Sequence, residues 1–233
     1  LTIVRSGGIC KIVDMANELV YAPSDPHGVP YDIFYPIDQM KDVNDQNEAL
    51  ERLAFLFMPE DDKMSDTSRF FNTEGRKILT AALIAFYHQG MDFIPICEKI
   101  VKSSWQDLFN EIDATGNDKA IRYINAFAGT SEQNTAGCKQ SADTVLKLFA
   151  TNERVKRTIR RVVDSNELFF APEKLEKHNV FVIIEDAKLE LYAPLLHIIT
   201  AQCLEHFAER SNKAETTILF CLDEFASFGR LEI

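Results

Sequence analysis

Two short apolar runs separated by a helix-length segment constrain the fold of this chain more than any other feature of its sequence. The runs are His178–Ile184 and Thr216–Leu222, and the residues Leu189–Arg210 between them have helical spacing. A strand, a helix and a second strand in this order form the unit from which parallel sheets are built. Because strands with such continuous apolar runs are usually buried on both faces of a parallel sheet, we expect the chain after about Ser165 to belong to an α/β domain.

The middle of the chain has a different pattern, in which apolar residues recur at helical spacing. The first expected helix is capped by Asn44 or Asp45 and stopped by Pro59. A longer helix, from about Thr67 to Gln89 with Gly90 as its C-terminal cap, is expected to form the spine of an all-helical module. The helices expected after it are Ile96–Val101, Trp105–Ile112 with Ser103 and Gln106 in capping-box spacing, Lys119–Phe127, and one that opens at Thr130 with Gln133 three residues on.

Short extended segments are expected at the N-terminal end. Gly8–Val13 and Glu18–Tyr21 are β-rich, and the Pro-, Gly- and Asp-rich run APSDPHGVP that follows them is a loop. The sequence therefore predicts extended structure at the start of the chain, helices in its middle and a strand-helix-strand unit at its end.

Composition excludes several classes of protein. The chain of 233 residues is 46% hydrophobic and 26% charged, which is the balance of an ordinary globular protein, and it has no apolar run long enough to cross a bilayer. Its formal net charge of -11 opposes general binding to nucleic acid, so that any DNA contact must be local. Five cysteines without a CxxC pair indicate a reducing compartment, and the five histidines show no zinc-binding spacing.

The segment TTILFCLDEF carries the clearest chemical signal. It places Asp223 and Glu224 directly after an apolar strand, at the end of the strand where α/β folds hold their active sites. In nucleotide triphosphatases this is the Walker B position. The first acid orients a magnesium ion, usually through water, and the second lies close enough to the γ-phosphate to polarise the attacking water. An acidic turn after a strand is also common in other proteins, so the residues that follow are needed to distinguish the two interpretations.

Those residues extend the motif to LDEFASFGRL, which resembles the Walker B segment of the TraG/TraD family of type IV secretion coupling proteins. The segment Tyr31–Asp38, YDIFYPID, is similar to a turn after the second strand of that family's motor domain. The long helix with Asn72, Gly75 and Leu79 resembles the family's all-alpha domain, and Val180–Phe207 resembles the strand and helix that precede Walker B. The resemblance covers nearly the whole chain from about Asn17.

The resemblance implies an α/β fold with a large all-helical insertion. On the family's pattern, residues 1–40 are the N-terminal part of a RecA-like nucleotide-binding domain, residues 41–164 are the all-alpha domain, and residues 165–233 complete the nucleotide-binding part as far as Walker B. Asp223 then is the acid associated with Mg²⁺ and Glu224 the one that polarises water. The family's proteins are hexameric, ATP-driven bacterial motors that link DNA and relaxosome proteins to a type IV secretion channel, and this chain is expected to be a cytoplasmic part of one anchored in the inner membrane.

A phosphate loop, GxxxxGK followed by Ser or Thr, is absent from the sequence. The nearest run, Ser6–Lys11, has the wrong glycine spacing and is followed by Ile12. The chain also begins with Leu1 and ends just after the Walker B motif, so we expect it to be a segment of a longer protein. We therefore expect the parent protein to be an ATPase that binds ATP and Mg²⁺, and the segment by itself to hold no cofactor and to be inactive. The oligomeric state of the segment is left open, with a monomer as one alternative.

The segment Asn152–Arg161 is basic in an otherwise acidic chain and is expected to start a helix. Its cations are Arg154, Lys156, Arg157, Arg160 and Arg161. Such a surface can contact DNA phosphates or an acidic partner, although a solvated helix face has the same composition. One of these arginines acting on a neighbouring subunit's nucleotide is a further alternative. The polar run Gly129–Asn134 resembles a stretch between two helices of the family's all-alpha domain.

Three functions are compatible with these observations. The first is a DNA-transfer motor in which the helical module recognises the substrate. The second is a non-enzymatic helical adaptor for relaxosome or effector proteins. The third is a RecA-like DNA translocase of the chromosome-segregation or repair kind. The sequence does not distinguish among DNA or protein substrates, nor among the faces of the helical module that would bind them.

Overall fold

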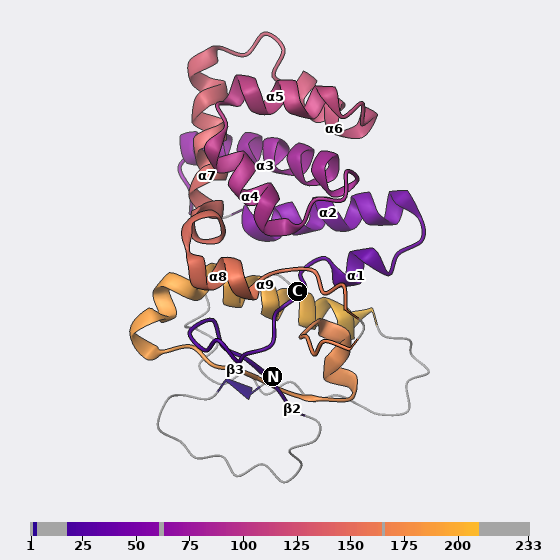
Figure 1. Ribbon diagram of the computed structural model, residues 1–233. Coiled ribbons are helices and arrows are strands. Elements are labelled where there is room, and N and C mark those ends of the chain that lie inside the picture. The colour runs from indigo at the N-terminus through magenta and orange to yellow at the C-terminus, as the bar shows by residue number, and fades with distance from the viewer. Residues whose placement is uncertain (1, 4–17, 61–62, 165, 210–233) are drawn as a thin grey trace. The chain divides into compact units, whose positions relative to one another are not determined.

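The computed structural model describes residues 2–3, 18–60, 63–164 and 166–209, which form two compact units (Figure 1). Unit 1 comprises Leu1–Pro36 and Arg157–Ile233, and unit 2 comprises Ile37–Lys156. The sequence placed the boundaries slightly later, after residues 40 and 164. The helical unit is thus inserted in the other unit along the chain, and the assignment of each unit to a domain of a larger protein stays a prediction.

Unit 2 is all-helical over its described residues. Its helices are α2 (Val43–Phe57), α3 (Asp66–Tyr87), α4 (Phe93–Lys102), α5 (Trp105–Ala114), α6 (Asp118–Asn125) and α7 (Glu132–Thr151), with the short α1 (Tyr35–Asp38) and α8 (Glu153–Thr158) at the two boundaries. Helix α3 packs against α2, α4, α5, α6 and α7. The prediction that the long helix forms the spine of the module is therefore confirmed.

The helix starts lie one to three residues from some of the positions expected from the sequence. Asp42 caps α2, because its Oδ1 accepts the amide of Asn44 at 2.6 Å, so the expectation that Asn44 or Asp45 caps this helix was wrong. In the same way Ser104, not Ser103, caps α5, and Ser131, not Thr130, caps α7. Neighbouring Ser, Thr, Asp and Asn residues have similar capping chemistry, and the one whose backbone is extended at the helix boundary takes the role.

The C-terminal end of α3 confirms the role expected of Gly90. This glycine has φ +80°, a left-handed conformation that favours glycine. Its amide donates to the carbonyl of Tyr87 at 2.8 Å, and the amide of Met91 donates to the carbonyl of Phe86 at 3.0 Å. These two bonds form a Schellman motif, which satisfies carbonyls at the end of the helix and turns the chain towards α4.

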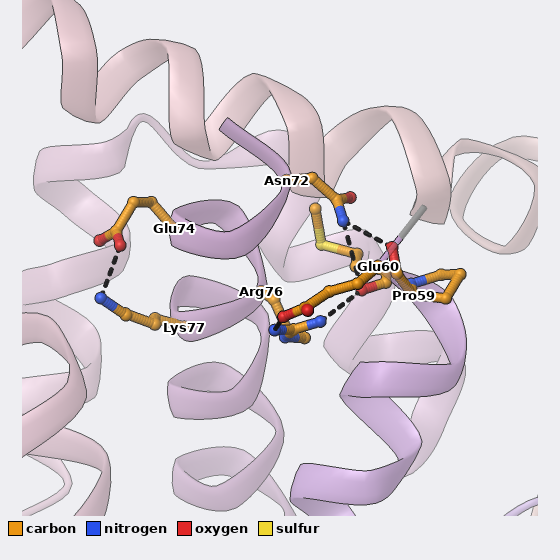
Figure 2. Close-up of polar contacts among 7 residues, drawn as sticks. Pro59, Glu60, Asn72, Glu74, Arg76 and Lys77 are labelled. Carbon is orange, nitrogen blue, oxygen red and sulfur yellow. Dashed lines mark hydrogen bonds and ion pairs between the residues drawn. The ribbon is translucent and has the colours of Figure 1, made fainter. Parts of the chain in front are cut away.

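Side chains from α3 bind the end of α2 (Figure 2). Asn72 Nδ2 donates to the carbonyl of Pro59 at 2.7 Å, and Arg76 donates to the carbonyl of Met58 at 2.9 Å and to Glu60 at 2.8 Å. The guanidinium of Arg76 also lies 4.7 Å from the ring centroid of Phe55. A cation at this position satisfies carbonyls at the negative end of the helix dipole. Asn72 and Arg76 therefore fix the first two long helices of unit 2 to each other.

Aromatic side chains fill the core between α2, α4 and α7. Phe57, Phe93 and Phe149 come one from each helix, and their ring centroids lie 5.2 to 5.5 Å from one another. All three are almost completely buried. Large apolar rings in mutual contact provide much of the free energy that holds such a core together.

Unit 1 contains a small parallel sheet. Its strands are β1 (Thr2–Ile3), β2 (Glu18–Tyr21) and β3 (Asn179–Val182), in the order β1-β3-β2. After β3 come the 3-10 helix η3 (Asp186–Lys188) and α9 (Leu189–Ala208), which contacts η3 and the 3-10 helix η2 (Pro172–Glu176). The expected strand Glu18–Tyr21, the parallel pairing and the helix after the first apolar run are confirmed. The expected strands Gly8–Val13 and Thr216–Leu222 lie outside the described residues.

The close approach of α3 and α7 gives a test of the packing in unit 2. A Cβ added at Gly75 would lie 2.6 Å from the carbonyl oxygen of Cys138, a backbone atom of α7. Although alanine favours a helix more than glycine does, we predict that Gly75→Ala lowers the free energy of unfolding by about 1–3 kcal/mol, because the two helices must separate. Urea denaturation measures this change.

The matched control is Gly137→Ala on α7, whose added Cβ would meet the ring of Phe71 at 2.6 Å. Phe71 is half-buried, so that its ring can move, and the loss at Gly137 should be the smaller of the two. Equal or greater stability of Gly75→Ala relative to the unaltered chain would contradict the proposed role of Gly75.

Candidate functional site

The two carboxylates of the expected Walker B motif, Asp223 and Glu224, lie outside the described residues. So does the glycine-bearing run Ser6–Lys11. The described part of the site consists of β3 and α9, which precede the motif in the chain, and of the segments of unit 1 that pack on them. The Walker B assignment itself stays a prediction.

The segment around Tyr31 joins two distant parts of the chain by backbone pairing. Tyr31 forms parallel bridges with Ile159 and with Phe170. Its amide donates to the carbonyl of Thr158 at 2.8 Å, and its carbonyl accepts the amide of Arg160 at 3.2 Å. On the other side, the amide of Phe170 donates to the carbonyl of Pro30 at 2.8 Å. The YDIFYPID segment thus lies between the two stretches that follow unit 2 in the chain.

Buried hydrogen bonds tie the same segment to α9. The hydroxyl of Tyr31 donates to Gln202 Oε1 at 2.6 Å, and Gln202 Nε2 donates to the carbonyl of Ile33 at 3.1 Å. Nearby, the hydroxyls of Tyr21 and Thr158 are 3.2 Å apart. Burial raises the pKa of Tyr31 well above its ordinary value, so the hydroxyl keeps its proton and acts as a donor. The helix that precedes the expected Walker B strand is therefore fixed to the YDIFYPID segment by a fully buried contact.

Asp32 makes the turn in this segment. Its carboxylate is buried and accepts the amide of Phe34 through Oδ1 at 3.2 Å and the amide of Val162 through Oδ2 at 3.1 Å. Amide bonds to both oxygens satisfy a charge that would otherwise be costly to bury. Asp32 thus shapes the turn and holds the chain after Ile159 in place.

The segment Asn152–Arg161 starts a helix, as expected, but the helix does not continue to Arg161. Helix α8 ends at Thr158, because the residues that follow pair with Tyr31 in extended conformation. The basic residues are also divided between the units, with Arg154 and Lys156 in unit 2 and Arg157, Arg160 and Arg161 in unit 1. The five basic residues of this segment, all within the described part of the chain, therefore do not lie on one helix, because Arg160 and Arg161 follow the end of α8.

Two of these cations form ion pairs with nearby carboxylates. Lys156 forms ion pairs with Glu98 at 2.7 Å and Glu153 at 2.8 Å, and hydrogen bonds to Glu153 and Glu98 raise its pKa. Arg160 forms an ion pair with Glu167.

The remaining arginines differ in exposure. The guanidinium of Arg161 lies 4.9 Å from the ring centroid of Phe34, and Arg157 donates to the carbonyl of Pro23 at 3.4 Å. Arg154 and Arg157 are exposed, whereas Arg160 and Arg161 are half-buried. Arg154 and Arg157 are therefore the two of the five cations that are most accessible to an external anion.

Within the described part of the chain, no group of three or more His, Cys, Asp or Glu side chains is arranged to hold a metal ion. None of the helices described here has both the length and the apolar character that a membrane crossing requires.

The family model of type IV secretory system conjugative DNA transfer proteins matches residues 16–233. The chain belongs to this family. The match extends over nearly all of both units, and it confirms the resemblance first seen in the LDEFASFGRL segment. Among curated proteins, no relative matches the chain.

Solved structures of bacterial coupling proteins have the same fold as this family member. The unbound monoclinic form of the bacterial conjugative coupling protein TrwB matches with a TM-score of 0.61 and 15% identity, over 85% of this chain and 42% of that one. The plasmid coupling protein TrwB in complex with the non-hydrolysable GTP analogue GDPNP matches equally well, over 85% and 43%. TrwB in complex with ADP and Mg²⁺ matches with a TM-score of 0.60 and 14% identity. The chain thus spans less than half of the length of these proteins.

Sequence reasoning missed the buried contact between Tyr31 and Gln202. The two residues are 171 positions apart in the chain, so no local pattern relates them. The sequence contains one indication of such a contact, since Gln202 is a polar residue within the apolar run of α9. A side-chain amide that is buried there needs a hydrogen-bond partner. The partner's identity required the fold.

This contact gives a second test. We predict that Tyr31→Phe lowers the free energy of unfolding by about 1–3 kcal/mol, because Gln202 Oε1 loses its donor while it remains buried. The control is Tyr35→Phe on the same segment, whose half-buried ring packs on Phe169 and which should change stability by less than about 0.5 kcal/mol. Urea denaturation of both variants measures the difference, and equal losses would show that the buried hydroxyl has no special role.

Proposed function

We propose that this chain is part of an ATP-driven coupling protein that links DNA substrates to a type IV secretion channel, and that unit 2 recognises the substrate. The observation that carries the proposal is the family match over residues 16–233, which includes the helical unit as well as the α/β unit. The fold shared with TrwB supports it. The match to a conjugative family favours this function over a translocase of the chromosome-segregation or repair kind.

The ATP site of the intact protein would use the two acids of the LDEF motif. Asp223 would hold Mg²⁺ through water, and Glu224 would polarise the attacking water; carboxylate oxygens are ligands that this ion prefers. ATP hydrolysis would supply the free energy for DNA movement. The nucleotide and Mg²⁺ complexes of TrwB support this part of the proposal. A homo-hexamer, an inner-membrane anchor and contacts with relaxosome proteins and the secretion channel complete it.

Substrate recognition by unit 2 must depend on local surfaces, since the chain carries a net charge of -11. Of the five basic residues singled out in the sequence, Arg154 and Arg157 are exposed and suit phosphate contacts. Lys156 and Arg160 are less exposed and form ion pairs with Glu98 and Glu167. We therefore propose that Arg154 contacts DNA together with Arg157, which lies three residues later on the same helix α8, at the point where the chain returns to unit 1.

One observation favours the second function, an adaptor that binds basic proteins. Helix α5 exposes the carboxylates of Asp107 and Asp113, which repel DNA but attract a basic partner. The two functions lead to opposite results in a DNA-binding experiment.

The experiment measures binding of labelled duplex and single-stranded DNA to the chain by fluorescence anisotropy between about 50 and 200 mM salt. We predict salt-sensitive binding by the unaltered chain. The double variant Arg154→Ser, Arg157→Ser should bind more weakly, and the slope of log affinity against log salt should fall by roughly 1 for each lost phosphate contact.

The control variant, Lys41→Ser with Arg52→Ser, removes the same charge from exposed positions at and near α2 and should bind as the unaltered chain does. Absence of DNA binding by the unaltered chain at low salt would contradict DNA recognition and support the adaptor function. Equal weakening of both variants would show that only the net charge matters, which contradicts the roles of Arg154 and Arg157.

A further inference from the structure

A lysine in the middle of α8 joins this short helix to α4. Lys156 Nζ lies 2.7 Å from a carboxylate oxygen of Glu98 on α4 and 2.8 Å from one of Glu153, which is on α8 itself. The side chains of Lys156 and Glu98 are 23% and 26% exposed, whereas that of Glu153 is 82% exposed. The hydrogen bond from Lys156 lowers the pKa of Glu98, so this carboxylate is charged at neutral pH. The contact between Lys156 and Glu98 is thus the better shielded of the two ion pairs.

A cap and a buried side chain fix the start of the same helix. Asn152 Oδ1 accepts the amides of Arg154 at 3.1 Å and of Val155 at 3.2 Å. The side chain of Val155 is completely buried. Helix α8 has only six residues, and helices this short are not stable by themselves, so its orientation depends on its contacts. Within unit 2, the buried Val155 and the bound Lys156 therefore determine how α8 is rotated about its axis.

This rotation places two arginines on the outward side of α8. Arg154 and Arg157 are three positions apart and are therefore neighbours on one face of the helix. Both are exposed, whereas Val155 between them is buried. If α8 turned about its axis or left α4, the two guanidinium groups would no longer face the same way. The position of the arginines thus depends on the contact of Lys156 with Glu98.

We propose that Glu98 is a positioning residue for the DNA contact, because its bond to Lys156 holds α8 in the orientation that presents Arg154 and Arg157 to phosphates. The inference rests on the proposed function and adds a residue that does not itself touch DNA. A carboxylate repels phosphates. Any favourable effect of Glu98 on DNA binding must therefore act through the helix that it holds, and this gives the inference a distinctive sign.

The test removes, one at a time, the two carboxylates that bind Lys156. Glu98→Ala breaks the contact between α8 and α4. The matched control, Glu153→Ala, takes the same charge away from the same lysine but leaves α8 joined to α4. Both are made in the whole chain, and thermal unfolding establishes that each remains folded. Affinity for a labelled duplex is then measured by fluorescence anisotropy at low salt.

We expect Glu98→Ala to bind duplex DNA about threefold or more weakly than the unaltered chain, although it has lost a negative charge. Glu153→Ala should bind as tightly as the unaltered chain or more tightly, because it loses only a repulsion. A second measurement adds Glu98→Ala to the double variant Arg154→Ser, Arg157→Ser. It should weaken binding no further there, since the arginines through which Glu98 acts are gone, whereas a general loss of stability would weaken binding in both chains.

Binding by Glu98→Ala that equals or exceeds that of the unaltered chain would overturn the inference and leave the proposed function intact. Equal weakening by Glu98→Ala and Glu153→Ala would overturn it as well, since the contact with α4 would then have no special role. The same holds if Glu98→Ala weakens binding by an equal factor with and without the two arginines. Absence of any binding by the unaltered chain would overturn DNA recognition by unit 2, and the inference with it.

Discussion

The backbone pairing of Tyr31 is the interaction on which the rest of the structure depends. The chain passes into unit 2 after Pro36 and returns to unit 1 at Arg157, and the returning residues Thr158–Arg160 pair directly with Tyr31. Asp32 and Gln202 fix the same place through buried hydrogen bonds. A helical insertion can be accommodated in an α/β unit only if its two connections are held together, and this pairing holds them.

The rigidity of unit 2 follows from a central helix in contact with its neighbours. Helix α3 holds the end of α2 through Asn72 and Arg76, and it approaches α7 closely at Gly75. Rigid packing of this kind fixes which helix faces are exposed, so that charge on each face becomes a property of the fold. The exposed carboxylates of Asp107 and Asp113 on α5 are one such feature.

The sequence predicted those parts of the fold that depend on local patterns. The strand Glu18–Tyr21, the long central helix and the cap at Gly90 are confirmed, since periodicity and a left-handed glycine are local signals. Helix starts were wrong by a few residues because adjacent polar residues compete for the cap. The end of α8 and the contact between Tyr31 and Gln202 depend on residues more than a hundred positions away, which no single segment encodes. The family came from the LDEFASFGRL motif, although its acids Asp223 and Glu224 lie outside the described residues.

Hydrogen-deuterium exchange of the chain with and without duplex DNA shows whether the helical unit carries the DNA contact. Amides slow their exchange where a ligand stabilises or covers the structure around them. If unit 2 carries the contact, added duplex slows exchange within Ile37–Lys156 and most of all in peptides that contain α8. Slower exchange confined to the described residues of unit 1 that lie outside α8 would contradict it.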